Sequence, residues 1–399
     1  MTLWHLHPEI QWPNTLSDES RLRGEAVAIA FPETEEEAAD ALREAWERGW
    51  SITVQGGRTG IAGGAVPQGG AILNLSRMTR ILGLRRRDSD GAFVVRVQPG
   101  VTLSALRQAL ATRDFATDGW SGADRQALEE FRREPPWMVT ADPTETSATV
   151  GGMVACNASG ARSFRYGAIR RWVESVRVAL ADGAVLALAR GRERARGRTF
   201  RLEVGGKILE GVLPSYRMPA VKNAAGYYAA DDMDLLDLFI GSEGTLGVIL
   251  EAELVLKPAS PVEWGVTAFL PDTTAVVRFV REVRAEPDGI IAIEYFSGSA
   301  LDLLRVARTE GGFLCDVAPS AEGPWGGGLR GDRGGHRGAG GADTPTGGGG
   351  YEELRGGRRE GLAGYGAPGN GTRQNFSPCR SRADQCPDCG AEKEGAGDH

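Results

Sequence analysis

The sequence predicts an α+β protein with two unequal folded domains, followed by a tail that does not fold with them. Three observations support this prediction. Short apolar runs alternate with amphipathic helical segments up to about residue 310. Three separate stretches rich in Gly, Ser and Thr interrupt that pattern. The last 89 residues hold 26 of the 57 glycines but only ten of Val, Ile, Leu, Met, Phe, Trp and Tyr combined, too little apolar surface to offset the entropy of ordering.

The first domain begins with a strand–helix–strand unit. Val27–Phe31 has the composition of a short buried strand. Thr34 and Glu37 have the spacing of a capping box that starts a helix, and Gly49 is placed to end it. Ser51–Gln55 is predicted as a second strand, and it leads directly into the first glycine-rich stretch.

Further strands and helices follow along the first domain. Asp182-Gly183 is typical of a hairpin turn between two strands, and the leucines after Thr102 recur at helical spacing. The expected strands are Ala71–Leu75, Phe93–Val97, Val173–Leu180, Ala184–Ala189 and Thr245–Leu256, and the expected helices start at Thr102 and cover Leu235–Ile240.

A second unit is expected to begin near Val262. Its pattern is that of a β-α-β-α start, which then runs into Gly311-Gly312 and the tail. The expected elements are a strand at Gly265–Leu270, a helix at Thr273–Glu286, a strand at Ile290–Tyr295 and a helix at Ala300–Ala307.

Charge and composition exclude several classes of function. A formal net charge of −7 provides no general attraction to nucleic acid or to an anionic membrane. No apolar run approaches the ~20 residues of a membrane span, and the N-terminal Met1–Pro13 lacks the features of a signal peptide. We therefore expect a cytoplasmic protein with no transmembrane segment and no nucleic-acid partner.

Histidine and cysteine are too scarce for several chemistries. Before residue 311 the histidines are His5 and His7, which excludes a histidine-based triad or an HExxH zinc site from that part. Cys386 and Cys389 have metal or redox spacing but no second pair, so no metal site is predicted. Cys156 is expected to be a buried free thiol that serves packing.

The first glycine-rich stretch, Gly56–Gly64, has five glycines in nine residues between two predicted strands. Glycine lets the backbone approach a ligand closely, and exposed N–H groups in sequence form a pocket for an anion such as a diphosphate. A pair of tight turns would explain the same residues. The pattern fits neither a Gly-x-Gly-x-x-Gly motif nor a Walker loop, and a strand follows it instead of a Rossmann helix, which disfavours an NAD-dependent enzyme.

Two further stretches of small residues follow, at Asp142–Gly160 and at Phe239–Ile249. The first suggests backbone packed against a large planar group, although a small-residue helix in a crowded interface would also explain it. Three such stretches on one α+β framework favour a single extended ligand. A dinucleotide has the diphosphate, the ring and the ribose–adenine parts to occupy them.

Together these motifs resemble the PCMH-type FAD-binding domain of the vanillyl-alcohol-oxidase superfamily, in particular the glycolate oxidase and D-lactate dehydrogenase group. The resemblance covers residues 25–310 and rests on several motifs in family order. These are the first glycine-rich stretch with Gly64-Ala65-Val66-Pro67, Asp142–Gly160 with Arg165-Tyr166-Gly167, Lys222-Asn223 with Gly226-Tyr227, and Leu238–Gly247.

The resemblance implies a division of the chain and a cofactor. Residues 1–24 would be an N-terminal arm, 25–261 an FAD-binding domain of two α+β subdomains, 262–310 the start of a truncated substrate-binding cap domain, and 311–399 a disordered or frame-shifted tail. FAD would be bound non-covalently, since no histidine lies near the first loop. Arg58 stands where the family has a third glycine, and its side chain would either pair with phosphate or lie outward. The implied FAD-binding residues are Gly56, Gly57, Arg58, Thr59, Gly60, Gly63, Gly64, Pro143, Thr144, Thr149, Gly151, Gly152, Asn157, Ala158, Ser159, Gly160, Glu243, Gly244, Thr245 and Ile249.

The implied activity is the oxidation of a small 2-hydroxy acid, such as D-lactate or glycolate, by hydride transfer to the flavin. Electrons would pass to an iron–sulfur, quinone or cytochrome acceptor. A carboxylate substrate needs a cation, and Lys222, with Asn223 and Tyr227, is the candidate group; a surface lysine is the alternative interpretation. The family's cap carries a His-x-Gly-Asp-x-Asn-x-His segment that has no counterpart in this sequence. A protein that binds FAD but is catalytically silent is therefore the second hypothesis.

Overall fold

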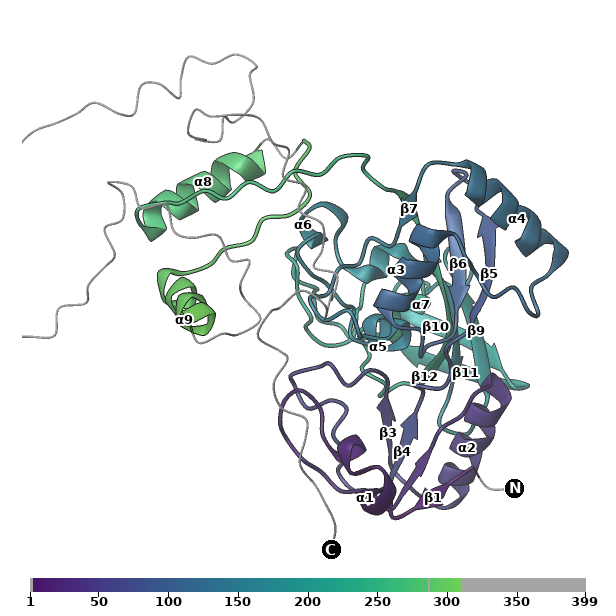
Figure 1. Ribbon diagram of the computed structural model, residues 1–399. Coiled ribbons are helices and arrows are strands. Elements are labelled where there is room, and N and C mark those ends of the chain that lie inside the picture. The colour runs from purple at the N-terminus through teal and green to yellow at the C-terminus, as the bar shows by residue number, and fades with distance from the viewer. Residues whose placement is uncertain (1–2, 286–287, 310–399) are drawn as a thin grey trace, which may run out of the picture. The chain divides into compact units, whose positions relative to one another are not determined.

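The computed structural model describes residues 3–285 and 288–309, and its α+β architecture confirms the predicted fold class (Figure 1). The expected tail, 311–399, lies outside the described residues. Two sheets form the described body, one of four strands and one of five, and two two-stranded sheets accompany them. None of the helices in the described ranges is long and apolar enough to cross a membrane.

The first sheet has the strand order β1-β2-β4-β3, with β2, β4 and β3 parallel and β1 antiparallel at one edge. Parallel strands need a crossover connection, and α2 supplies the one from β2 to β3, which lie on opposite sides of β4. The Thr34 hydroxyl accepts from the Glu37 N–H as predicted, while the Glu37 carboxylate accepts from the Glu33 N–H, one residue earlier than a capping box requires. The elements are β1 His5–Leu6, α1 Pro8–Gln11, the 3-10 helix η1 Pro13–Leu16, β2 Ala28–Ala30, α2 Glu35–Glu47, β3 Ile52–Gln55 and β4 Ala71–Asn74.

The second sheet is antiparallel, in the order β5-β6-β12-β8-β9. The late strand β12 lies at its centre, between β6 and β8, so the chain returns to the middle of the sheet from the third glycine-rich stretch. The strands are β5 Ile81–Arg86, β6 Phe93–Val97, β8 Val173–Ala179, β9 Val185–Ala189 and β12 Val248–Val255, with the short pair β7 Trp137–Met138 and β13 Lys257–Pro258.

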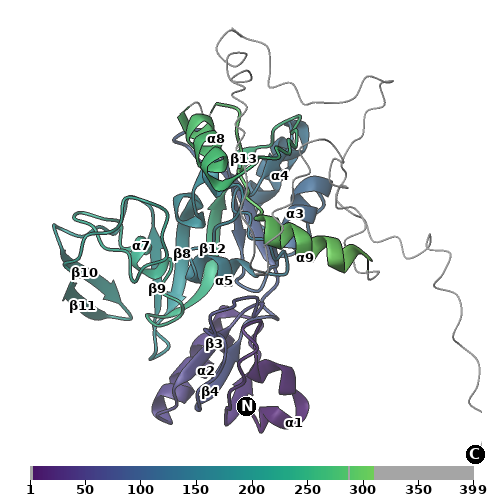
Figure 2. The same cartoon turned by 90° about the vertical axis from the view of Figure 1, so that its left-hand side faces the viewer.

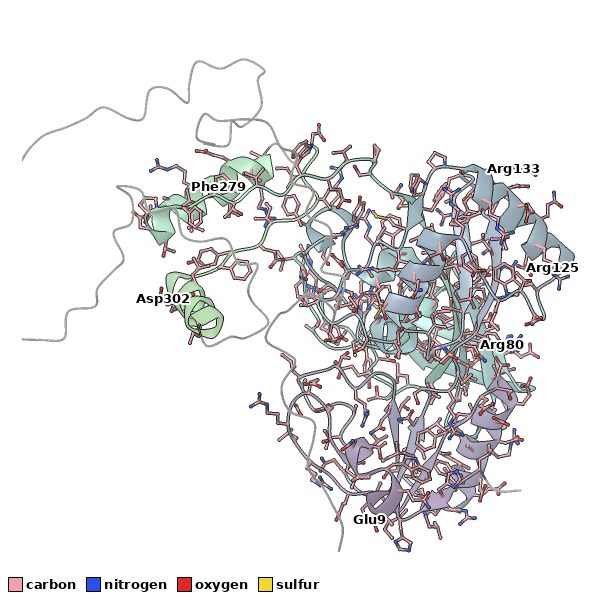
Figure 3. The ribbon with its side chains drawn as sticks, viewed as in Figure 1. Glu9, Arg80, Arg125, Arg133, Phe279 and Asp302 are labelled. Carbon is pink, nitrogen blue, oxygen red and sulfur yellow. The ribbon has the colours of Figure 1, made fainter. Side chains whose placement is uncertain are left out.

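Helices complete the second subdomain and bury its apolar side chains. The helix predicted after Thr102 is α3, whose first turn is capped by the Thr102 hydroxyl. The amphipathic α4 buries Leu128 and Phe131, while Arg125 and Arg133 project from it (Figure 3). The helices are α3 Leu103–Thr112, α4 Gly122–Arg133, α5 Val150–Ala155, α6 Ser163–Tyr166, the 3-10 helix η2 Ile169–Trp172 and α7 Leu236–Phe239.

The hairpin of β10 Thr199–Val204 and β11 Lys207–Val212 was not predicted. It projects away from the five-stranded sheet in Figure 2. Its two-residue turn, Gly205-Gly206, has positive φ at both positions, which is the geometry that such hairpin turns demand. The Gly-Gly pair between two runs with β propensity was the signal that could have identified it.

In the second unit the predicted helices are confirmed and the predicted strands are wrong. The helices are α8 Thr273–Ala285 and α9 Gly298–Thr309, whereas Gly265–Leu270 and Ile290–Tyr295 form no strand. A strand persists only when its backbone groups pair with a neighbour, and the described residues supply no neighbour to these two segments.

Burial raises the pKa of Glu251, a partly buried residue of β12 that faces Arg177 of β8. The Glu251 carboxyl group therefore binds its proton more tightly in the folded protein than in the unfolded chain. The ionised side chain costs stability at neutral pH, and the cost disappears as the pH falls towards the ordinary value of 4.5. We expect Glu251→Gln to raise the Tm at pH 7 by about 1–3 °C and to lose this advantage near pH 4.

Glu253 provides the matched control on the same strand. Its carboxylate lies 2.6 Å from the Arg85 guanidinium, so Glu253→Gln removes an ion pair and is expected to lower the Tm at pH 7. Thermal melting of both variants at the two pH values tests the prediction. A loss of stability in Glu251→Gln at pH 7 would show that attraction to Arg177 outweighs burial.

Candidate functional site

The first glycine-rich loop, residues 56–64, follows the end of β3, and the side chain of Gln55 holds it closed. Gln55 is fully buried; its amide nitrogen donates to the carbonyl oxygens of Thr15 and Ala65 at 2.6 and 2.7 Å. Its amide oxygen accepts from Asn74 at 3.0 Å. The bond to Ala65 ties the end of the loop to its start. Gln55 was not among the predicted site residues, and a polar residue at the end of a buried strand was the available signal.

The loop presents unused hydrogen-bond donors. Within the described part of the chain, the N–H groups of residues 57–64 have no acceptor. Gly57, Gly60 and Gly64 are exposed, and a Cβ atom added to Gly60 would meet no atom within 4 Å. Consecutive free N–H groups on glycine backbone can bind an anion, so these residues fit the diphosphate of a dinucleotide.

Arg58 does not point into this loop. Its φ of +55° is in the left-handed region, and its guanidinium donates to the main-chain carbonyl of Asn14 in the N-terminal segment. In this structure the side chain therefore adopts the outward orientation of the two that the sequence left open. Thr59 is partly buried beside it.

The second glycine-rich stretch packs against this loop through α5. A Cβ atom on Gly56 would lie 2.3 Å from the Thr149 hydroxyl, and one on Gly57 would lie 2.6 Å from the Ser147 carbonyl oxygen. Thr149 caps α5 by accepting from the Gly152 N–H at 3.4 Å. Only glycine in the loop permits this approach, and this requirement explains the two consecutive glycines.

Other predicted residues of the second stretch pack against neighbouring groups of the protein. Gly151 is buried against Pro99, where a Cβ atom would lie 2.5 Å from the proline ring. Gly160 packs on the Asp142 carbonyl, which brings the loop at Pro143 and Thr144 beside the loop at Ala158 and Ser159. Asn157, at φ +47°, accepts through its side chain from the Arg170 N–H at 3.2 Å.

The third stretch is bound to the end of α5. The N–H groups of Gly241 and Glu243 donate to the Val154 and Ala155 carbonyls at 3.0 and 2.9 Å. Gly244 then passes beside Val54 of β3, 3.5 Å from where its Cβ atom would stand. The structure thus brings the three predicted stretches together. Ile249, by contrast, is 5% exposed within β12 and belongs to the core.

A cavity of about 600 Å³ opens beside the second and third stretches. Asn157 and Glu243 line it from those stretches, and Lys222 and Asn223 line it from the loop between β11 and α7. Two of the three residues proposed for catalysis therefore share a cavity with two of the proposed cofactor-binding residues.

Tyr227 does not line the cavity. Its hydroxyl lies 2.7 Å from the Thr245 hydroxyl, so it connects the 218–228 loop to the third stretch. Asn223 shapes the same loop, since its side chain donates to the Val221 carbonyl at 2.8 Å and accepts from the Ala225 N–H at 3.2 Å. These contacts hold Lys222 at the cavity.

Two cations line the cavity with no carboxylate partner in the described residues, Lys222 and Arg171. Arg170 is different, because its side chain already has partners within the protein. Its guanidinium forms an ion pair with Asp237 at 3.3 Å and lies over the Tyr228 ring at 4.4 Å. Burial lowers the pKa of Arg170, with the Asp237 carboxylate opposing that effect.

Cys156 is exposed at this cavity, so the expectation of a buried packing residue is wrong. It is the C-cap residue that follows α5. Desolvation by the surrounding protein raises the pKa of the Cys156 thiol, and the negative charge of Glu243 acts in the same direction. The thiol therefore stays protonated at neutral pH and is a poor nucleophile.

Comparison with known proteins agrees with this geometry. Residues 26–121 and 120–189 match a family described as the FAD binding domain, which names FAD as the cofactor of this part of the chain. The chain is 34% identical over 246 residues to D-lactate dehydrogenase of Anaerostipes hadrus, covering 61% of this chain and 39% of that one. It is 32% identical over 317 residues to the mitochondrial D-2-hydroxyglutarate dehydrogenase of Bos taurus, covering 78% and 45%.

The chain thus spans less than half the length of these two relatives. Among solved structures, alkyldihydroxyacetonephosphate synthase is similar at a TM-score of 0.48 and 17% identity, covering 71% of this chain and 47% of that one.

Glycine substitutions test the diphosphate loop. Because a Cβ atom on Gly60 meets nothing within 4 Å, Gly60→Ala should leave the Tm of the cofactor-free protein unchanged and weaken FAD binding about tenfold by filling the space at the free N–H groups. Gly57→Ala should destabilise the protein itself by about 1–3 kcal/mol, since its Cβ atom meets the Ser147 carbonyl.

Gly122→Ala, at the start of α4 with open space around it, is the control for both measurements. Thermal melting and FAD titration by flavin fluorescence give the two readouts. If Gly60→Ala binds FAD as tightly as the wild type does, the loop is not part of the cofactor site.

Proposed function

Because residues 26–121 and 120–189 match an FAD binding domain, we propose that the chain oxidises a small 2-hydroxy acid of the D-lactate or glycolate type and passes the electrons to an external acceptor. One observation supports this most directly: Lys222 and Asn223 line the same cavity as Asn157 and Glu243. That arrangement puts a cation for a carboxylate beside the backbone that would hold the flavin. The names of the two dehydrogenase relatives support the same class of reaction.

Four polar residues at the cavity or on the loop that borders it have a role in this proposal. The Lys222 ammonium binds the substrate carboxylate, and Asn223 keeps the loop in the shape that directs Lys222 there. Tyr227 fixes the loop to Thr245. FAD, when bound, would supply the acceptor for the hydride of the substrate α-carbon. Glu243 is the one carboxylate that lines the described cavity, which makes it the candidate acceptor of the hydroxyl proton.

A second candidate is a protein that binds FAD without turning over a substrate. The observation that favours it is the position of the histidines in the described residues. His5 and His7 belong to the N-terminal segment around β1, and neither lines the cavity. The same residues contain no group of three or more His, Cys, Asp or Glu side chains able to hold a metal ion. The described residues therefore contain no replacement for the histidine-containing cap segment that the resemblance implies.

The absorption spectrum of the purified protein separates the two candidates. We expect a yellow protein whose flavin band is bleached, in the absence of oxygen, by D-lactate, glycolate or D-2-hydroxyglutarate. A yellow protein that none of these acids bleaches, but dithionite does, supports the silent flavoprotein. A colourless protein that takes up no added FAD contradicts both.

Lys222→Gln tests the role of the cavity cation. Loss of the charge should raise the KM for the hydroxy acid about 10- to 100-fold, with a smaller effect on kcat, because binding of the carboxylate is lost in both ground and transition states. Lys207→Gln is the matched control: Lys207 is an exposed lysine of β11 paired with Asp182 at 3.0 Å, and does not line the cavity. Equal KM values for the two variants would exclude Lys222 from the substrate site.

A further inference from the structure

The N-terminal segment of residues 13–24, here called the strap, contacts the outer side of the first glycine-rich loop at several points. The Thr15 carbonyl accepts from Gln55 at 2.6 Å, and the Asp18 carboxylate accepts from the Ala65 N–H at 3.4 Å. The Leu22 side chain lies 3.0 Å from where a Cβ atom of Gly63 would stand. The strap therefore touches the loop near its start, near its end and at a residue between them.

Arg58 is the residue through which the strap holds the tip of the loop. Its guanidinium donates to the Asn14 carbonyl, and its own carbonyl accepts from the Glu19 N–H at 3.3 Å. Both ends of the residue are thus bound to the strap. The φ of +55° costs about 1 kcal/mol or more for a residue with a Cβ atom, so this conformation needs such contacts to persist.

We propose that the strap is part of the cofactor site and that Arg58 is a positioning residue for it. The N–H groups of residues 57–64 have no acceptor within the described chain, so their direction depends on the contacts that hold the rest of the loop. The strap adds contacts at Arg58 and Gly63 to those that Gln55 makes at the ends of the loop, and a loop held before the ligand arrives loses less entropy on binding. This inference rests on the FAD site proposed for the loop.

Three variants separate positioning from a structural role. Arg58→Gly suits the positive φ and removes the bond to Asn14, so the cofactor-free Tm should not fall while the FAD dissociation constant rises about tenfold. Arg58→Lys keeps one donor and should recover part of the affinity. Arg113→Gly is the matched control, because Arg113 also has a left-handed φ of +59° and donates to the Glu134 carbonyl at 2.7 Å, at the end of α3. By the same reasoning its Tm should not fall, and its FAD affinity should equal that of the wild type.

Titration with KCl distinguishes positioning from direct contact with the diphosphate. If Arg58 acts only through the strap, wild type and Arg58→Gly should show the same salt dependence of FAD binding. A smaller dependence in Arg58→Gly would show that the guanidinium contacts phosphate and would overturn the proposal. Unchanged FAD affinity in Arg58→Gly would overturn it as well.

Hydrogen exchange of the wild-type chain gives a test that requires no variant to fold. FAD should slow exchange in residues 57–65 and also in residues 14–24, because the two segments are coupled. Protection of the loop alone would overturn the role of the strap and leave the FAD site intact. A wild-type chain that binds no FAD would overturn the site assignment and this inference together.

Discussion

The geometry of the site depends on α5, a helix of six residues at which the three glycine-rich stretches meet. Its N-cap, Thr149, sits against Gly56, and the carbonyls near its end accept from Gly241 and Glu243. Each contact is made by backbone or by a hydroxyl at close range. A larger side chain at any of these points would separate the segments, so the small residues of α5 and its neighbours are a condition of the assembly as well as of ligand access.

An ion-pair network around the buried Asp237 carboxylate stabilises the cavity wall at Arg170. The Asp237 carboxylate is shared by Arg170 and Arg190, with Arg190 at 2.6 Å, and Asp237 is only 8% exposed. Removing one member would leave the others charged and desolvated, which costs far more than the pair contributes when intact. This network connects the 3-10 helix η2 to the turn that begins the third stretch, so two parts of the cavity wall are held together.

Much of this architecture follows from local signals in the sequence. Thr34 and Thr102 indicate helix starts because their hydroxyls cap the first turn, and Asp182-Gly183 indicates a hairpin turn. Signals of this kind depend only on neighbouring residues, so the tertiary structure does not change them. The strands expected at Gly265–Leu270 and Ile290–Tyr295 failed because strand formation depends on a partner elsewhere in the chain. Lys222 and Arg171 are 51 residues apart in the sequence, so their presence at one cavity is a tertiary property that no local pattern contains. The exposure of Cys156 is likewise a tertiary property that no local pattern contains.

The two segments that form no strand have a consequence for the behaviour of the chain in solution. Trp264, Phe269 and Tyr295 are 87%, 61% and 58% exposed, and the backbone around them keeps its hydrogen-bonding groups unpaired within the described residues. A second copy of the same segment offers both apolar surface and a matching edge. Exposed apolar side chains beside unpaired backbone promote self-association, so these two segments, and not the core of the FAD-binding body, govern how the described chain meets its own copies.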